Sequence, residues 1–220
     1  KEETIQCFFN HGILYHVPEN VLMEEGHIAN IHINMFETDD QFILNEIEDK
    51  DDWTWEVEHK FLGKHPERIE AISDYIRTNI NKTNTLILCE NEIGKKVAEK
   101  LGVDFINKDV KEDVRESYFE KFTISDAEPY TLIATYGCAG TGVSIDEIYY
   151  GILIDPAKDE ERLVQALGRF YRLDGNFNFA EIDDISSNLP YSKKHKRERK
   201  KIYSKKELPF TENKNYIKVF

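Results

Sequence analysis

The chain has 220 residues, of which 40% are hydrophobic, and a formal net charge of −13 at pH 7. This length allows one substantial core, and the net charge excludes a protein that coats nucleic acid with its whole surface. No run approaches the roughly 20 apolar residues that span a bilayer, and no signal-peptide core follows Lys1, so we expect neither export nor a membrane partner.

Charge is distributed unevenly along the chain. The stretch from Glu37 to Glu58 contains ten acidic residues against one lysine, and we expect it to avoid phosphate backbones. Between Lys193 and Lys206, nine lysines and arginines stand against a single glutamate. Such a run is either the solvated face of a helix or a surface that binds nucleic acid.

The cysteines and histidines indicate no disulfide and no metal site. The three cysteines are widely spaced and lack a Cys-x-x-Cys pair, so we interpret them as reduced packing residues of an intracellular protein. The closest histidine pairs, His11 with His16 and His27 with His32, do not have the spacing that places two ligands on one helix face.

The first predicted strand contains Ile31, Ile33 and Met35, which recur at every second position. The first predicted helix begins at Pro66, because proline favours the first turn of a helix. Its apolar residues have helical spacing and are expected to face a sheet; they are Ile69, Ile72, Ile76 and Ile80.

From Thr85 onward, short apolar runs alternate with amphipathic segments, a pattern typical of βα units on a parallel sheet. The apolar runs predict strands at 85–89, 105–106, 131–135 and 150–155. The sequence therefore predicts an α/β fold.

Two amphipathic helices are predicted between these strands. Asn91 is expected to cap the first helix, whose apolar residues recur at every fourth position until Gly102 ends it. The second helix covers the segment up to Phe122, and Val114, Tyr118 and Phe122 are expected to form its apolar face.

A glycine-rich segment, ATYGCAGTGVSID, begins at Ala134 within a predicted strand. Gly137, Gly140 and Gly142 allow its backbone to approach a ligand closely. A dinucleotide-binding loop is one interpretation, but that motif has the spacing Gly-x-Gly-x-x-Gly and opens a long helix. Here the next strand follows within a few residues. A tight connection between two strands is the other interpretation.

The last predicted helix runs from about Asp159 to Arg172 and carries the segment QALGRFYR. In a helix, Gln165, Arg169 and Arg172 would share one face. Gly168 costs about 1 kcal/mol of helix propensity relative to alanine, which suits the close approach of a ligand. Two guanidinium groups on one face suit a phosphoryl group, because each planar fork donates two hydrogen bonds and stays charged. The alternative is a surface helix whose arginines pair with nearby acidic side chains.

Together and in this order, these segments resemble the second RecA-like lobe of superfamily 2 helicases, and most closely the UvsW-type phage recombination and repair helicases. The matching pieces are TLILC for the motif IV strand, ATYGCAGTGVSI for motif V and QALGRFYR for motif VI. The resemblance implies a RecA-like parallel sheet with helices on both faces, followed by a basic C-terminal extension. The expected domains are 1–21 for the end of the first lobe or the connection between lobes, 22–172 for the C-terminal RecA-like lobe, and 173–220 for the extension.

The resemblance implies the C-terminal half of an ATP-dependent DNA helicase or translocase that acts in phage DNA recombination, repair or replication. Its cofactors would be ATP and Mg²⁺. Because this chain has no Gly-x-x-x-x-Gly-Lys-Ser/Thr loop, a first lobe would hold most of the phosphates and the Mg²⁺. The partners would be that N-terminal lobe and single-stranded or branched DNA, in the host cytoplasm if the protein is phage-encoded. This chain alone is not expected to hydrolyse ATP.

Carried over by position, the resemblance assigns roles to individual residues. Arg172 would be the arginine finger, and Arg169 would be its phosphate-binding companion. The nucleotide-binding residues would be Gly140, Thr141, Gly142, Ser144 and Gln165. Many members of the superfamily have aspartate at the position of Ser144, so the ribose contact of that aspartate would be missing here. The DNA-binding residues would be Thr135, Tyr136 and Gly137 of motif V, and Lys193, Lys194, Lys196 and Arg197 of the basic segment.

Two alternatives belong to other functional classes. A non-catalytic nucleic-acid-binding module that keeps the helicase fold would bind DNA whether or not Arg172 is present. A dinucleotide-dependent enzyme would bind its cofactor with this chain alone.

Overall fold

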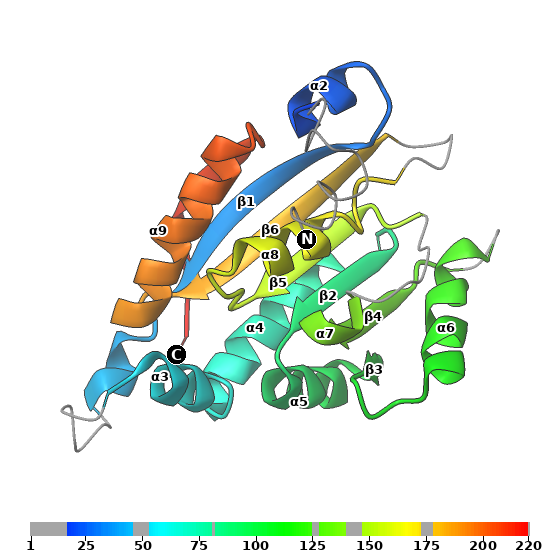
Figure 1. The fold of residues 1–220 in the computed structure, drawn as a ribbon. Helices are drawn as coiled ribbons and strands as arrows, with labels where there is room; N and C mark the ends of the chain where they lie inside the picture. Colours follow the sequence, from blue (N-terminus) through cyan, green and yellow to red (C-terminus); the bar gives the residue numbers. More distant parts are fainter. Residues whose placement is uncertain are drawn as a thin grey trace, which may run out of the picture.

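The computed structural model describes residues 17–45, 53–80, 82–124, 128–139, 147–172 and 178–219. These residues form a seven-stranded sheet in the order β3-β4-β2-β5-β6-β1-β7, and all its strand pairs are parallel. Helices cover both faces of the sheet (Figure 1). The α/β fold with a parallel sheet and helices on both faces is therefore confirmed.

The bounds of the described elements are as follows. The strands are β1 (Asn30–Thr38), β2 (Thr85–Cys89), β3 (Asp104–Ile106), β4 (Thr131–Thr135), β5 (Tyr150–Ile154), β6 (Phe179–Ser187) and β7 (Phe210–Ile217). The α-helices are α2 (Glu19–Glu24), α3 (Trp55–Leu62), α4 (Pro66–Asn79), α5 (Asn91–Leu101), α6 (Glu112–Glu120), α7 (Tyr136–Ala139), α8 (Glu160–Leu167) and α9 (Pro190–Lys205). Two 3₁₀ turns are η1 (Gln41–Asn45) and η2 (Lys121–Thr123).

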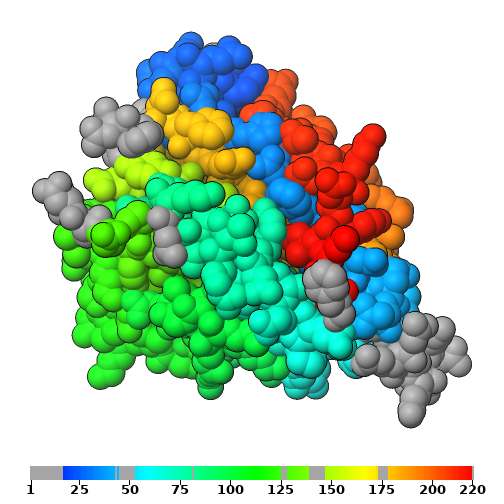
Figure 2. All heavy atoms as spheres, turned by 180° about the vertical axis from the view of Figure 1, so that it is seen from behind, coloured from blue at the N-terminus to red at the C-terminus, as the bar shows by residue number. Residues whose placement is uncertain are grey.

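The central strands are buried on both faces, which explains their continuous apolar sequences. Every residue of β2, β4 and β5 is buried, as expected for a parallel sheet that is covered on both sides. Along β2, Leu86 and Leu88 join one core, whereas Ile87 and Cys89 join the other. Helices α6, α8 and α9 pack against the first core, and α4 and α5 pack against the second. Figure 2 shows the molecule from behind, with α4 and α5 on the near side and β7, in red, beside them.

Several predictions based on apolar periodicity are confirmed. Strand β1 buries Ile31, Ile33 and Met35 in one core. Helix α4 begins at Pro66 and turns its isoleucines toward the sheet. Helix α5 ends at Gly102, whose φ of 68° is the left-handed conformation that favours glycine.

Two local predictions are wrong. Asn91 does not cap α5, because it is already the first helical residue; its side-chain oxygen accepts a hydrogen bond from Nδ2 of Asn107 at 2.8 Å. The predicted apolar face of α6 is wrong at Val114, which is 41% exposed, whereas Tyr118 packs partly buried against the core and Phe122, in η2, is buried as predicted; Phe119 is a further buried residue. The helix changes into the 3₁₀ turn η2 after Glu120, and this tighter turn brings Phe119 and Phe122 to the same side.

The sequence suggests an extension beyond Leu173, but the structure places this region within the sheet. Strand β6 lies between β5 and β1, and β7 pairs with the other side of β1. Strand β6 carries two consecutive buried aspartates, so its sequence lacks the continuous apolar run that predicts a buried strand. The hydroxyl groups of Tyr75 and Tyr150 donate hydrogen bonds to Asp183, so one of these carboxylates is satisfied by tyrosines. The other, Asp184, belongs to the network described below.

Candidate functional site

The chain bends sharply between β5 and α8, and a side chain caps the start of α8. Asp155, the first residue after β5, has a φ of 48°, which is uncommon for a residue with a side chain. Pro156 follows it. Oδ1 of Asp159 then accepts a hydrogen bond from the backbone N–H of Arg162 at 2.7 Å and so caps α8. These features fix the point at which α8 starts.

Helix α8 ends earlier than the sequence suggests. The backbone N–H groups of Arg169 and Phe170 bond to carbonyl oxygens three residues earlier, at 3.2 and 2.9 Å. Such bonds form tight turns and do not continue an α-helix. The prediction that Gln165, Arg169 and Arg172 occupy one face of a single helix is therefore wrong, because the chain leaves the helix at Gly168.

The segment 168–172, which we name the arginine turn, is held on the sheet by Phe170. The ring of Phe170 is buried and packs over Gly151 of β5. A Cβ atom added to Gly151 would lie 2.6 Å from two ring carbons of Phe170. In addition, the carbonyl oxygen of Tyr171 accepts a hydrogen bond from the N–H of Ala29 at 2.8 Å, just before β1. The turn is therefore anchored at its centre and its end, and its arginines remain partly exposed.

The two arginines of the turn interact electrostatically. Burial lowers the pKa of Arg169, and the positive charge of Arg172 lowers it further. Two like charges held close together favour an anion that both can bind. This pair of donors suits the phosphate groups of a nucleotide. Gln165 lies on the exposed side of α8, where its Nε2 donates to Oε1 of Glu161 at 3.3 Å.

Because Phe170 fits a space that only glycine leaves open, we expect Gly151→Ala to lower the free energy of unfolding by about 1–3 kcal/mol. The phenylalanine ring would have to move, and the arginine turn would move with it. Urea unfolding of the chain measures this effect. Gly137→Ala is the matched control, since a Cβ atom at Gly137 meets nothing within 4 Å. Equal stability of the two variants would contradict the proposed packing.

The motif V residues lie near the start of α8, away from the arginine turn. Thr135 ends β4, and Tyr136 and Gly137 open α7. The hydroxyl group of Tyr136 donates to the carbonyl oxygen of Ile154 at 3.2 Å, and the guanidinium group of Arg162 lies 5.3 Å from its ring centroid. Helix α8, about 12 Å long, separates this group from the arginine turn. The predicted nucleotide-binding residues Gly140, Thr141, Gly142 and Ser144 lie outside the described residues.

The basic segment forms α9, and the structure divides its four predicted DNA-binding residues. Lys194 and Arg197 are exposed, and Lys193 is partly exposed. The side chain of Lys196 is only 7% exposed, and its Nζ lies 2.9 Å from Oε1 of Glu37. Because this ammonium group is paired inside the fold, we leave Lys196 out of the DNA-binding proposal below.

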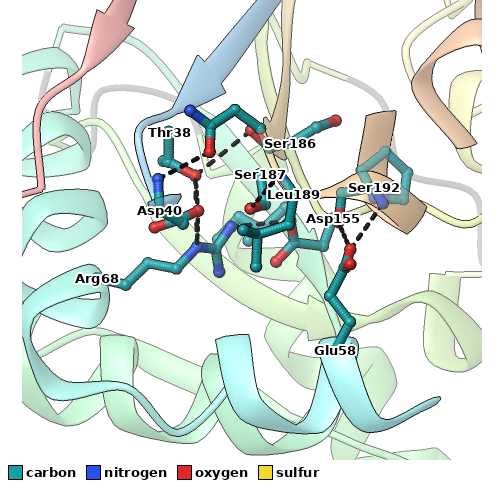
Figure 3. Close-up of polar contacts among 12 residues, drawn as sticks. Thr38, Asp40, Glu58, Arg68, Asp155, Ser186, Ser187, Leu189 and Ser192 are labelled. Atoms are coloured by element: carbon teal, nitrogen blue, oxygen red, sulfur yellow. Dashed lines mark hydrogen bonds and ion pairs between the residues drawn. The ribbon is translucent and has the colours of Figure 1, made fainter. Parts of the chain in front are cut away.

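A buried network of charges lies at the carboxyl end of the sheet (Figure 3). Arg68 of α4 is fully buried; its Nε lies 3.0 Å from Oδ2 of Asp40, and its Nη2 lies 2.8 Å from Oδ1 of Asp155. Burial alone would lower the pKa of Arg68, but the carboxylates of Asp155 and Asp40 raise it above its ordinary value. Arg68 is not among the site residues predicted from the sequence. Arg68 lies four residues before Ile72 and therefore on the same face of α4. This position on the apolar face indicates that its side chain is buried.

A second buried arginine holds the same connection from the other side of the sheet. Arg199 of α9 forms a bidentate pair with Asp184, with N–O distances of 2.9 and 2.7 Å. Its Nη1 donates to the carbonyl oxygen of Pro156 at 2.7 Å. Burial opposes the charge of Arg199, but Asp184 raises the pKa above its ordinary value. Arg68 and Arg199 therefore bracket the Asp155–Pro156 bend that leads into α8.

Glu58 links α3 to the start of α9. Its buried carboxylate accepts hydrogen bonds from the backbone N–H groups of Tyr191 and Ser192, at 3.1 and 2.7 Å. These N–H groups belong to the first turn of α9, where the N-cap residue Leu189 provides no side-chain acceptor. A negative charge at this end also suits the helix dipole. Glu58 therefore caps a helix from a distant part of the chain.

We expect Glu58→Gln to lower the free energy of unfolding by about 1–3 kcal/mol, because the amide group of glutamine cannot accept hydrogen bonds at both of its ends. Chemical unfolding followed by circular dichroism provides the measurement. Glu56→Gln, an exposed neighbour in the same helix, removes the same charge without this contact. A similar loss of stability in both variants would show that Glu58 does not act as a cap.

Among the described residues, no three histidine, cysteine, aspartate or glutamate side chains are grouped so that they could hold a metal ion. No helix in the described part of the chain is long and apolar enough to cross a membrane.

Comparisons with known proteins agree with the fold. A search of curated proteins finds no match. Among solved structures, the chain is similar to UvsW of T4, with a TM-score of 0.65 and 17% identity over 86% of this chain and 42% of that chain. It is also similar to the C-terminal part of the Fun30 ATPase domain, with a TM-score of 0.50 and 17% identity over 61% of this chain and 45% of the other. The chain thus spans less than half of each of these two structures.

The sequence profile described as the helicase conserved C-terminal domain matches residues 67–174. This range runs from α4 to just beyond the arginine turn. The matched range contains strands β2, β3, β4 and β5 of the described sheet. Over residues 67–174, about half of its length, the chain therefore matches the helicase conserved C-terminal domain.

Proposed function

We propose that this chain is the C-terminal half of an ATP-dependent DNA helicase or translocase, and that it supplies the arginine turn to an ATP site completed by an N-terminal lobe. The observation that carries the proposal is the arginine turn itself. Phe170 anchors it on Gly151, and its two arginines lie close enough for Arg172 to lower the pKa of Arg169. The helicase profile covers the same segment.

In this proposal, Arg172 is the arginine finger, and Arg169 is its phosphate-binding companion. Their guanidinium groups bind the phosphates of ATP as the two lobes close, and they stabilise negative charge on the transferred phosphoryl group. Gln165 and the glycine-rich segment from Gly140 to Ser144 contribute further nucleotide contacts. Mg²⁺ and most of the phosphate contacts belong to the N-terminal lobe, since the present sequence contains no phosphate-binding loop.

We place the DNA-binding surface on two parts of the lobe. One part is the end of β4 with the start of α7, formed by Thr135, Tyr136 and Gly137. The other is the exposed side of α9, formed by Lys193, Lys194 and Arg197. Opening and closing of the lobes would move these surfaces along a DNA strand. A role in phage DNA recombination, repair or replication belongs to the same proposal, and the similarity to UvsW of T4 supports it.

The test is ATP turnover by a protein that joins this chain to an N-terminal lobe, measured without DNA, with single-stranded DNA and with branched DNA. We expect turnover that DNA stimulates. If the two-lobed protein binds DNA but shows no turnover with any DNA or RNA, the motor is ruled out, and the chain is a nucleic-acid-binding module with a helicase fold.

A further inference from the structure

A cleft of about 830 Å³ lies between α3, α9 and the residues that lead into α8. Trp55 of α3 forms one wall, and Lys158 comes from the segment before α8. One side of α9 also lines the cleft and adjoins Trp55, with residues at helical spacing; these are Tyr191, Lys194, His195, Glu198, Lys201, Ile202 and Lys205. The cleft therefore combines aromatic and basic side chains from three separate parts of the chain.

The acidic side chains of this cleft already have partners. Oε1 of Glu198 lies 2.8 Å from Nζ of Lys201, and Oε1 of Glu160 lies 3.0 Å from Nζ of Lys205. Asp159 caps α8 through its contact with a backbone N–H group. The carboxylates of the cleft are thus engaged within the fold, and two of its four lysines are engaged with them.

The other two lysines, Lys158 and Lys194, form no ion pair within the part of the chain that the structure describes. The positive charges of both lysines lower the pKa values of His195 and Glu198. Burial lowers the pKa of His195 to about 4, and the charges of Lys158 and Lys194 contribute to this shift. The hydrogen bond from Lys201 lowers the pKa of Glu198, and Lys158 and Lys194 add to that effect. The cleft therefore carries a local excess of positive charge.

The aromatic wall is held in place from within the protein. The ring centroids of Trp55 and His195 are 3.9 Å apart, and those of Trp55 and His59 are 4.7 Å apart. Trp55 remains partly exposed and also lines a neighbouring cleft of about 420 Å³ at the start of α5. A partly exposed indole with a fixed position is suited to stack an unpaired base, because little conformational freedom is lost on binding.

We propose that this cleft, named the Trp55 cleft, binds single-stranded DNA, with backbone phosphates on Lys158 and Lys194 and an unpaired base stacked on Trp55. Lysines bind the backbone phosphates of single strands, and aromatic side chains stack their bases without regard to sequence. The inference rests on the proposed function, because it adds a strand-binding site to the DNA-binding surface of the lobe.

The position of the Trp55 cleft agrees with this assignment. Ala157 and Asp159 line the cleft, and they also line a small pocket next to Tyr136. Tyr136 belongs to the other part of the proposed DNA-binding surface. A strand that leaves the end of β4 can therefore enter the Trp55 cleft along the segment before α8. The proposed strand path runs from α7 to α9.

The two tryptophans of the chain, Trp53 and Trp55, provide the first measurement. Titration of the whole 220-residue chain with oligothymidylate is expected to quench tryptophan fluorescence. The quenching should be lost in Trp55→Phe and kept in Trp53→Phe. A duplex of equal length should quench far less, because its bases are already stacked on one another. Equal quenching by duplex and single strand would overturn base stacking on Trp55.

The phosphate contacts are tested separately by the anisotropy of a labelled oligothymidylate. Lys158→Ala combined with Lys194→Ala is expected to weaken binding at least tenfold at low salt. The slope of log K against log salt should also become shallower by about 1.4, because each single-strand phosphate contact contributes about 0.7. Lys95→Ala combined with Lys214→Ala is the matched control, since both lysines are exposed and lie outside the cleft.

Unchanged affinity and salt slope in the Lys158 and Lys194 double variant would overturn the inference. So would an unmodified chain that does not bind oligothymidylate. Neither result would decide the proposed function, which fails only if the two-lobed protein shows no ATP turnover that depends on DNA. The two failures are therefore distinguishable.

Discussion

Replacement of Arg172 by alanine is expected to lower the kcat for ATP by about 10³-fold or more in a protein that joins this chain to an N-terminal lobe. The reason is the loss of a guanidinium group that would neutralise charge on the phosphoryl group in the transition state. Arg172→Lys should recover little of the rate, because an ammonium group lacks the planar fork of two donors. Steady-state turnover at saturating ATP and DNA measures both variants.

The control for Arg172 is Arg77→Ala. Arg77 is an exposed arginine of α4 whose guanidinium group pairs with Asp74 on the same helix, so its loss should leave turnover unchanged. Circular dichroism should show the same fold in all three variants. An Arg172→Ala variant with a normal kcat and a raised KM would contradict the finger, because that pattern indicates an interaction made equally in the ground state.

Replacement of Arg199 by alanine is expected to lower the free energy of unfolding by about 3–5 kcal/mol, because it leaves the carboxylate of Asp184 buried without its partner. The carbonyl oxygen of Pro156 would also lose a hydrogen-bond donor. Since domains are typically stable by about 5–15 kcal/mol, this is a large fraction of the total. Urea unfolding measures the change.

Arg197→Ala is the matched control for Arg199. Arg197 lies two residues away on the exposed side of α9, and its removal should change the free energy of unfolding by less than about 0.5 kcal/mol. Replacing Arg199 and Asp184 together by methionine and leucine should recover part of the loss, because no charge is then left unpaired. A single Arg199→Ala variant as stable as Arg197→Ala would show that the buried pair does not stabilise the fold.

Strands that are buried on both faces could be predicted from the sequence, because burial leaves a continuous apolar run. Strands β2, β4 and β5 have this property. Strand β6 is equally central but contains Asp183 and Asp184, and aspartates normally indicate an exposed segment. Their burial depends on Tyr75, Tyr150 and Arg199, which come from distant parts of the chain. No local pattern contains that information.

The residues of the candidate site could be predicted from the sequence, but their arrangement in space could not. The segment QALGRFYR predicts Arg169 and Arg172 as phosphate-binding residues, and the structure holds both in one turn, where Arg172 lowers the pKa of Arg169; their role stays a prediction. The early end of α8 could not be predicted, because the turn is held by the packing of Phe170 against Gly151. In the basic segment, nothing in the sequence distinguishes the buried Lys196 from its exposed neighbours Lys194 and Arg197. The ion pair that buries Lys196 is made with a glutamate in β1, far away along the chain.

The order of the strands also bears on how the protein is made. Within the described sheet, β1 pairs with β6 and β7, both of which are encoded near the other end of the chain. During translation, β3, β4, β2 and β5 can pair as soon as they leave the ribosome. Strand β1 is synthesised before all of them, but its pairing partners are not yet made. Until then, the apolar side chains of Ile31, Ile33 and Met35 remain uncovered. Such late, long-range pairing is slow and exposed to aggregation. The first strand of the described sheet can therefore take its place only after β6 has been made.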